Sequence, residues 1–500
     1  MNMAVTTQRN PSVAVIGAGM TGILMAIRLR EAGIDNITIL EKADKLGGTW
    51  RENTYPGVAC DVPAHMYTYS FRGNPEWRHR FAHGDEIQAY FESVAQEYGI
   101  TSQVRFGEAL ERCHFNDGRW ELRTSRGEEL SVDFVVAATG ILHHPAYPDI
   151  RGLESFTGDM WHTARWNHDV ELKGKRVGII GTGSTAAQVI GEIGKQCGHL
   201  TIFQRTPQWI VSVPDKEYSE ADAASLRGNQ ARMSKLSQRY AAAFRRLFTA
   251  AVTGQKLPHM LMDWMARRNL RKSVRDPELR AKLTPDYKVG CKRLIINSTF
   301  YTAVQRDNVH LETHGIDRIT EQGVVTADGT VHELDVLILA TGFSPFNFMR
   351  PMDLKGRNGL DIEDAWANKI QAYRSVCLPG FPNFFLMLGP NTPIGNYSVI
   401  AMSEVQADYV IKLINQWREG TLQQVEATEE AKQRYNAYLK AGMGKTVWVG
   451  GCQSWYLDGD GDPAMWPYSW EQWVGEHEQP ELDDFVRELP AESEPLRPAA

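Results

Sequence analysis

The feature that most constrains this chain is a pattern that occurs twice: a short apolar strand, a glycine-rich turn and an apolar-periodic helix, followed at once by a second strand. The first copy reads VAVIGAG, MTGILMAIRLREAG and ITILEKA, and the second reads KRVGIIGTG, STAAQVIGEIGKQCG and HLTIFQRT. A strand joined to a helix through closely spaced glycines is typical of a nucleotide-binding β-α-β unit. We therefore predict an α/β protein with two Rossmann-like dinucleotide-binding domains.

The first copy carries GxGxxG as Gly17, Gly19 and Gly22, and Glu41 ends the strand that follows. The first glycine allows the tight turn, the second lets the backbone approach a pyrophosphate, and the third permits close packing of the helix. A carboxylate at Glu41 accepts hydrogen bonds from a ribose 2′-hydroxyl and repels a 2′-phosphate. This site is expected to bind FAD or NAD, and the alternative is an ordinary glycine turn beside a surface glutamate.

The turn of the second copy contains Gly181, Gly183, Ser184 and Ala186. Alanine is small enough to replace the third glycine where the helix meets the strand. Arg205 follows the first glycine of its copy by 24 residues, the same spacing that separates Gly17 from Glu41. Because a guanidinium pairs with a 2′-phosphate, and Thr206 beside it can donate a hydrogen bond, we expect this site to bind NADPH. The alternative is a surface arginine on an NADH site.

A chain that binds two different dinucleotides is expected to pass electrons from NADPH to a flavin, which then needs an acceptor. The six cysteines form no CxxC pair of the kind that a disulfide reductase uses beside its flavin. Spaced ligands for an iron–sulfur cluster or a haem are missing, and the fourteen histidines show no HExxH motif. We therefore expect no bound metal, and O₂ as the electron acceptor.

Composition and charge exclude several classes of protein. Hydrophobic residues make up 42% of the 500 residues and charged residues 23%, as in globular proteins. The net charge of −7 argues against a nucleic-acid partner. The chain shows no signal-peptide pattern, no apolar run of about 18 residues, and only scattered cysteines. These features predict a cytoplasmic protein in a reducing compartment, without an integral membrane segment.

The order of the signals predicts a discontinuous first domain. Residues 1–150 are expected to form the first part of an FAD-binding domain, residues 151–340 an NADPH-binding domain, and residues 341–500 a return to the FAD-binding domain with a C-terminal loop and an acidic tail. Residues from about 215 to 285 read as a helical, basic-rich insertion in the second domain. We interpret it as a solvated amphipathic cap; a membrane-surface helix and a lid over the substrate entrance are the alternatives.

Longer motifs surround the two nucleotide units. The stretch GGTWRENTYPGVACD, residues 47–61, is followed by VPAHMYTYSF, and Phe156, Gly158, His162 and Trp166 match the pattern FxGxxxHxxxW. QRTP, GCKRLI, LMLGPN and SWYLDGDG follow later. Together these motifs resemble the type I Baeyer-Villiger monooxygenases over nearly the whole chain. The related flavin-containing monooxygenases have Phe or Tyr in place of Trp166, so the tryptophan favours the Baeyer-Villiger branch.

The resemblance implies an NADPH-dependent flavoprotein monooxygenase that uses FAD and O₂ to insert one oxygen atom next to a ketone carbonyl, through a flavin C4a-peroxide, to give an ester or lactone. It implies that Arg293 and Asp61 are catalytic, because a permanently charged guanidinium can stabilise oxygen anions. It also implies that Lys292 binds the NADP phosphate and that Trp455 belongs to a mobile loop over NADP. The residues of the flavin-side motif expected to contact FAD are Gly48, Thr49, Trp50, Asp61 and Tyr67.

Other functions stay open at this point. Oxygenation of nitrogen or sulfur, or alkane hydroxylation, would use the same cofactors, whereas an NADPH oxidase or flavin reductase would reduce a diffusible acceptor without oxygenating a substrate. We expect His162 and Trp166 to fix how the domains meet, Cys60 to be a packing residue, and His143 and His144 to be loop residues. The partner is expected to be a small-molecule ketone, and the protein a monomer or weak homo-oligomer.

Overall fold

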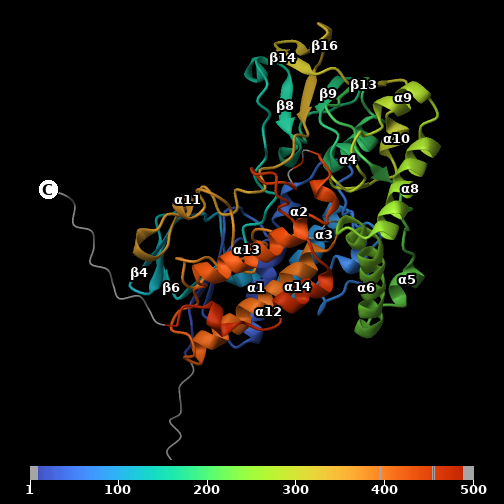
Figure 1. Ribbon diagram of the computed structural model, residues 1–500. Helices are drawn as coiled ribbons and strands as arrows, with labels where there is room; N and C mark the ends of the chain where they lie inside the picture. Colours follow the sequence, from blue (N-terminus) through green and yellow to red (C-terminus); the bar gives the residue numbers. More distant parts are fainter. Residues whose placement is uncertain (1–8, 394–396, 453, 455, 488–500) are drawn as a thin grey trace, which may run out of the picture.

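The computed structural model describes residues 9–393, 397–452, 454 and 456–487 (Figure 1). Two five-stranded sheets organise the chain, and every pairing within them is parallel. Trp455 and residues 488–500, which form the end of the expected acidic tail, lie outside the described residues.

The first sheet has the strand order β19-β7-β1-β2-β3. Its strands are β1 (Val13–Ile16), β2 (Ile37–Glu41), β3 (Val104–Phe106), β7 (Phe134–Ala137) and β19 (Phe384–Leu386). β1 and β7 are buried throughout, because their sequences VAVI and FVVA supply apolar side chains to both faces of a covered parallel sheet. The strand β19 comes from far along the chain and pairs with β7, so the chain returns to this sheet after building the second one.

The second sheet repeats this arrangement in the order β13-β10-β9-β17-β8. Its strands are β8 (Asp159–His162), β9 (Arg176–Ile180), β10 (His199–Phe203), β13 (Val309–Glu312) and β17 (Val336–Leu339). In each sheet the glycine-rich turn leads from the central strand into a helix, α1 (Met20–Glu31) in the first and α4 (Ser184–Ile193) in the second. The predicted α/β fold with two Rossmann-like domains is confirmed.

Two smaller sheets were not predicted from the sequence. One contains β4 (Leu110–Asn116), β5 (Arg119–Thr124), β6 (Glu129–Val132) and β18 (Asp353–Lys355), and the other contains β14 (Ile316–Thr320), β15 (Gly323–Thr326) and β16 (Val331–Glu333). β5 alternates exposed and buried residues, as a strand with one face on the core does. In Figure 1 these sheets lie at the left and at the top, at the two ends of the molecule.

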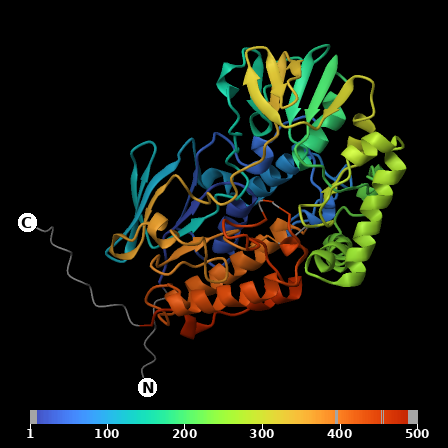
Figure 2. The ribbon, with the colours of Figure 1, turned by 45° about the horizontal axis from the view of Figure 1, so that its top comes forward.

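The expected helical insertion is present and lies along one side of the molecule (Figure 2). Its helices are α5 (Glu220–Ala224), α6 (Gln230–Phe244), α7 (Ala250–Val252), α8 (Lys256–Ser273) and α9 (Pro277–Lys282). It is bounded by β11 (Ile210–Val211) and β12 (Ile295–Ile296), which pair with each other. α8 packs against α7 and β11, so the insertion is fixed to the second domain.

Helices from the last third of the chain pack on the first domain. The long helix α12 (Val399–Arg418) lies against α1, and α13 (Glu429–Met443) and α14 (Trp470–Glu476) lie beside it in Figures 1 and 2. The remaining helices are α2 (Thr49–Glu52), α3 (Gly84–Glu97), α10 (Phe300–Ala303) and α11 (Ile362–Ala365). Within the described ranges, no helix combines the length and the apolar character that crossing a bilayer requires.

Candidate active site

A cavity of about 590 Å³ connects the two dinucleotide units. The turn at Gly17 and Gly19, Glu41 and the segment Gly47–Asn53 line it from the first domain. Ser184 and Arg293 line it from the second. Ligands of open parallel sheets bind beyond the carboxyl ends of the strands, which is where the residues after β1 and β9 lie. Residues from both predicted nucleotide sites therefore share one cavity.

Both glycine turns bring the backbone into close contact with the neighbouring strand connection. Gly17 has φ +102°, and a Cβ atom there would lie 2.7 Å from the carbonyl oxygen of Ala138. Gly181 has φ +114°, and a Cβ atom there would lie 2.5 Å from the carbonyl oxygen of Ala340. Only glycine fits both the conformation and the space. Ala186, which replaces the third glycine, is fully buried, as a packing position of the helix requires.

Glu41 is buried at the end of β2, in the wall of the cavity. Its Oε2 accepts a hydrogen bond from the N–H of Ala18 at 2.9 Å, and its Oε1 accepts one from the N–H of Ala43, also at 2.9 Å. Arg51 Nη1 lies 3.2 Å from Oε1 and balances the charge. Each carboxylate oxygen can accept more than one hydrogen bond, so Glu41 can also bind a ribose hydroxyl.

The segment Gly48–Tyr67 continues the wall. Gly48 lies against Gly19, where a Cβ on Gly19 would be 3.5 Å from its Cα, and Thr49 begins α2. The indole N–H of Trp50 donates to the Tyr67 hydroxyl at 3.1 Å, and the two rings meet edge to face. Burial raises the pKa of Tyr67, so its hydroxyl stays protonated. Gly48, Thr49, Trp50 and Tyr67 thus all lie on the cavity, as a flavin-binding role requires.

Asp61 and Arg293, 232 residues apart in sequence, form an ion pair in the cavity. Arg293 Nε donates to Asp61 Oδ2 at 3.0 Å, and Nη2 donates to the same oxygen at 2.5 Å. The Asp61 carboxylate raises the pKa of Arg293 further above its ordinary value, so the guanidinium is charged at every relevant pH. The structure therefore brings the two predicted catalytic residues together, one from each domain.

Two cations belong to the predicted second nucleotide site, and neither is among the residues that line the cavity. Arg205 is exposed just after β10, and Lys292 is partly buried with Nζ 5.1 Å from the centre of the Tyr287 ring. Burial lowers the pKa of Lys292, and the charge of Arg205 lowers it further, against an opposing effect of Asp286. The carbonyl of Thr206 accepts a hydrogen bond from Thr182 Oγ1 at 2.9 Å, which holds the segment after Arg205 against the glycine turn. Two neighbouring cations of this kind suit a phosphate dianion.

The FxGxxxHxxxW residues lie together around the end of β8. Phe156 and His162 are buried, a Cβ on Gly158 would be 2.6 Å from the carbonyl oxygen of Asp335, and Trp166 meets Trp161 edge to face. His162 Nδ1 accepts from the N–H of Ala164 at 3.1 Å.

Burial lowers the pKa of His162 to about 4, so the ring is neutral near pH 7. His162 is not among the described residues that line the cavity. This geometry supports the expected structural role.

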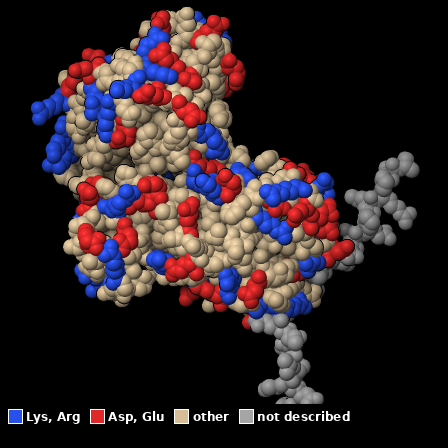
Figure 3. Space-filling view, turned by 180° about the vertical axis from the view of Figure 1, so that it is seen from behind, with Lys and Arg blue, Asp and Glu red and all other residues tan. Residues whose placement is uncertain are grey.

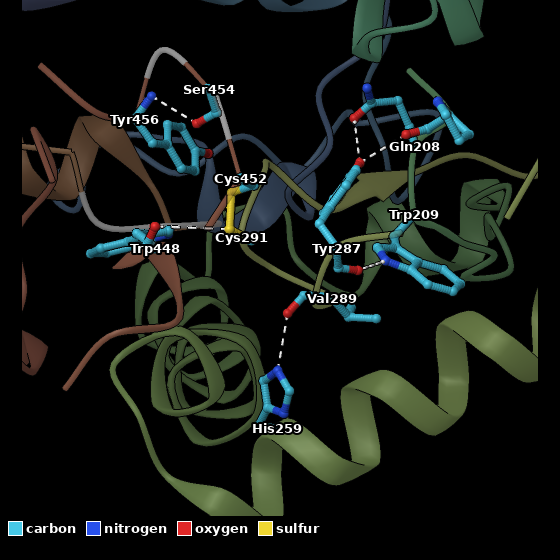
Figure 4. Close-up of a disulfide and its surroundings, with 11 residues drawn as sticks. Gln208, Trp209, His259, Tyr287, Val289, Cys291, Trp448, Cys452, Ser454 and Tyr456 are labelled. Carbon is cyan, nitrogen blue, oxygen red and sulfur yellow. Dashed lines mark hydrogen bonds between the residues drawn. A yellow bond between two sulfur atoms is a disulfide. The ribbon is translucent and has the colours of Figure 1, made fainter. Parts of the chain in front are cut away.

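The scattered cysteines predicted a reducing compartment, and this prediction needs a correction. Cys291 and Cys452, 161 residues apart, form a disulfide (Figure 4). The bond joins the segment that carries Lys292 and Arg293 to the C-terminal segment that carries Tyr456. Disulfides are typical of oxidising environments, so the cysteines no longer support a reducing compartment. Cys60 is free and buried, and burial raises the pKa of its thiol, as expected of a packing residue.

Several cavity residues were not singled out from the sequence. Arg51, which pairs with Glu41, lies inside the GGTWRENTYPGVACD stretch and could have been selected as a cation beside a predicted carboxylate. Gln188 of α4 accepts from the Tyr55 hydroxyl and donates to the carbonyl of Ala59, both at 2.9 Å, but no sequence signal marks a helix residue that contacts the other domain. Tyr456 is another such residue. His143 and His144, which the sequence placed in a loop, do lie in a loop and also line the cavity.

This chain is similar in sequence to several proteins named as monooxygenases. An uncharacterized monooxygenase of Mycobacterium tuberculosis is 47% identical over 93% of both chains. A protein named Baeyer-Villiger monooxygenase from Streptomyces coelicolor is 39% identical over 96% of this chain and 93% of its own. A protein of the same name from Pseudomonas aeruginosa is 37% identical over 94% of this chain and 91% of its own.

Solved structures show the same architecture. The closed crystal structure of cyclohexanone monooxygenase matches with a TM-score of 0.84 and 28% identity, over 94% of this chain and 96% of its own. A steroid monooxygenase bound to NADP matches with a TM-score of 0.83 and 30% identity, over 94% of this chain and 96% of its own. The resemblance to Baeyer-Villiger monooxygenases that the motifs indicated is thus confirmed. Residues 10–444 match the family model of flavin-binding monooxygenase-like proteins, and this chain, an oxidoreductase, belongs to that family.

Proposed function

We propose that this protein is an FAD- and NADPH-dependent Baeyer-Villiger monooxygenase that inserts one oxygen atom from O₂ next to a ketone carbonyl and releases an ester or lactone. The observation that carries the proposal is the Asp61–Arg293 ion pair in the wall of a cavity that the first glycine turn and the start of α4 both line. Neither an oxidase nor a flavin reductase needs a charged guanidinium held beside its flavin by a second domain. A reaction that builds negative charge on a substrate oxygen does.

The first turn fits FAD. Gly17 and Gly19 allow the backbone N–H groups at the start of α1 to approach a pyrophosphate, and Glu41 can bind the adenosine ribose. The residues that would line the flavin are Gly48, Thr49, Trp50, Asp61 and Tyr67. When bound, FAD would accept hydride from NADPH and activate O₂, which is chemistry that no side chain of the protein supplies.

The second turn fits NADPH. Gly181, Gly183, Ser184 and Ala186 form the turn and the start of α4, while Arg205 and Lys292 supply two cations for the 2′-phosphate. Thr206 is placed beside Arg205 as a further donor. Trp455 lies outside the described residues, so its place in a loop over NADP stays a prediction. Ser184 and Arg293 line the same cavity, so nicotinamide and flavin can meet there.

Arg293 acts through its positive charge and through the orientation of its guanidinium. Asp61 engages the Nε and Nη2 edge of the guanidinium, and we assign Nη1 to the substrate oxygen on which negative charge develops. Because the guanidinium stays charged, it stabilises that anion without a proton transfer. Asp61 fixes its direction and offsets the cost of placing a cation in the cavity wall. Loss of one such donor typically costs about 10²- to 10³-fold in rate.

The residues of FxGxxxHxxxW position the domains. His162 is neutral and buried, and its ring contacts Tyr147 and Phe343 rather than the cavity. We therefore assign Phe156, Gly158, His162 and Trp166 to the structure of the second domain near its junction with the first. The cytoplasmic location and the monomeric or weakly oligomeric state stay predictions, as does the division at residues 150 and 340.

The test uses purified FAD-loaded protein, NADPH, air and a panel of aryl-alkyl, aliphatic, cyclic and steroid ketones. We expect one ester or lactone formed for each NADPH consumed with at least one ketone class. Hydrogen peroxide in proportion to NADPH regardless of ketone would favour an oxidase. Sulfoxide or N-oxide formation without any ester would favour oxygenation of sulfur or nitrogen.

The matched variants are Arg293→Ala and Arg293→Lys. We expect the FAD of the Arg293→Ala variant still to be reduced by NADPH, but the variant to make on the order of 10²- to 10³-fold less ester. Arg293→Lys keeps the charge without the planar fork and should recover part of the activity. An ester yield equal to that of the unmodified enzyme in Arg293→Ala would remove Arg293 from the reaction.

A further inference from the structure

The helical insertion exposes an apolar face. Four of the nine large hydrophobic side chains that are exposed in the described part of the chain belong to α8. They are Leu257, Met260, Leu261 and Trp264, with exposed fractions of 79%, 65%, 48% and 53%. We call these four residues the α8 stripe. Single exposed hydrophobic residues are common on proteins, but a contiguous group is typical of an interaction surface.

The stripe faces away from the protein. Its members follow the spacing i, i+3, i+4 and i+7, which places them on one side of a helix. Met262, Ala266 and Leu270, on the opposite side, are buried at 3% exposure or less, and α8 packs there against α7 and β11. The other face of this amphipathic helix is therefore already covered by the rest of the protein. The helix has 18 residues, a length of about 27 Å, and the stripe occupies its first half.

The second half of the same outward side is cationic. Arg268, Arg271 and Lys272 continue the line of the stripe and are exposed. The guanidinium of Arg268 lies 5.3 Å from the centre of the Trp264 ring, so apolar and cationic parts are continuous. Residues 256–275 contain six Lys or Arg and one Asp, although the whole chain has a net charge of −7. Figure 3, the view from behind, has several Lys and Arg at its upper left, the side where Figure 1 has α8 and α9 at its upper right.

We propose that α8 docks this protein reversibly on an anionic lipid bilayer. Leu257, Leu261 and Trp264 would enter the boundary between headgroups and acyl chains, and the following cations would bind the headgroup phosphates. A helix with apolar residues that include Trp on its outer side, next to Lys and Arg, is the kind that lies in the plane of a membrane surface. This binding is peripheral, in keeping with the absence of a spanning helix from the described residues.

Charge argues against a second copy of the chain as the partner. Two α8 faces that met around a twofold axis would bring their cationic halves near each other or near an apolar stripe, and neither arrangement supplies an anion. A bilayer that contains phosphatidylglycerol supplies both an apolar layer and a dense layer of negative charge. Each Lys or Arg near such a surface strengthens binding about fivefold.

The experiment is sedimentation of the FAD-loaded protein with vesicles of phosphatidylcholine alone and of phosphatidylcholine and phosphatidylglycerol in equal parts. We expect sedimentation with the mixed vesicles only, and release when the salt concentration is raised. Leu261→Glu combined with Trp264→Glu should abolish binding, and Arg268→Gln combined with Arg271→Gln should weaken it about 25-fold. Both variants should keep NADPH oxidation in the absence of vesicles, because neither the α8 stripe nor Arg268 and Arg271 line the cavity.

The matched control is Val331→Glu, since Val331 in β16 has the same 53% exposure as Trp264 and lies outside the insertion. This variant should bind the mixed vesicles as the unmodified protein does. Equal binding to both kinds of vesicle, or full binding by the Leu261→Glu and Trp264→Glu variant, would overturn the proposal. A dimer in analytical ultracentrifugation that dissociates in that variant, without vesicle binding by the unmodified protein, would assign the stripe to a second copy instead.

Discussion

Replacement of Arg205 by alanine tests how the second site distinguishes NADPH from NADH. Hydrogen bonds to charged groups are worth about 1.5–3 kcal/mol. Arg205 is exposed and Lys292 stays in place, so solvent screening and the second cation favour the lower end of this range. We expect Arg205→Ala to lower the ratio of kcat/KM for NADPH to that for NADH about tenfold, with little change in kcat/KM for NADH itself.

The same variant has a signature in its pH dependence. Lys292 binds phosphate as a cation, so the affinity for NADPH falls as the pH rises through the Lys292 pKa. Arg205 is one of the causes that lower this pKa, so its removal should move the alkaline fall in kcat/KM for NADPH to higher pH. NADH, which has no 2′-phosphate, should show no such shift.

The assay is steady-state oxidation of each nucleotide across a pH series, with Arg176→Ala as the control. Arg176 is an exposed arginine of the same sheet that pairs with Glu333 and Asp335, away from the glycine turn. An unchanged NADPH to NADH ratio in Arg205→Ala would refute the assignment of Arg205 to the phosphate. Equal losses with both nucleotides would show that the change disturbs the fold rather than the recognition of the phosphate.

Three further predictions concern the fold. Gly17 has φ +102°, and the carbonyl of Ala138 lies where a Cβ atom would be, so Gly17→Ala should cost about 1–3 kcal/mol of strain. The variant should have a lower ratio of flavin to protein, measured by absorbance, and a full flavin content would contradict this. Cys452→Ser should lose about 2–4 kcal/mol of stability, and a reductant should lower the Tm of the unmodified protein but not of this variant. Burial raises the pKa of Glu404 to about 7, so the stability it contributes is full below its unfolded pKa and is lost as the pH rises through 7. Glu404→Gln should therefore raise the Tm at pH 8 relative to the unmodified protein but change it little at acid pH, and an equal shift at both would count against this.

For the Asp61–Arg293 pair, the motifs and the tertiary structure supply different information. The motifs indicated Asp61 and Arg293, but not that Asp61 engages Nε and Nη2 through one oxygen and so sets the direction of the guanidinium. That detail depends on the contact between two domains. Gln188, which ties α4 to the loop at Tyr55 and Ala59, depends on the same contact and has no signature in its own helix.

The two β-α-β units could be predicted from the residues alone, because apolar runs, close-packed glycines and the residues at strand ends are local requirements of a parallel sheet around a dinucleotide. The opposite charges of Glu41 and Arg205 could be predicted in the same way. Contacts between distant segments become visible in the folded chain alone: they are the Cys291–Cys452 bond, the pairing of β19 with the first sheet, and the burial of one face of α8. Periodicity shows that a helix has two faces, but the side that is covered depends on the elements that pack against it.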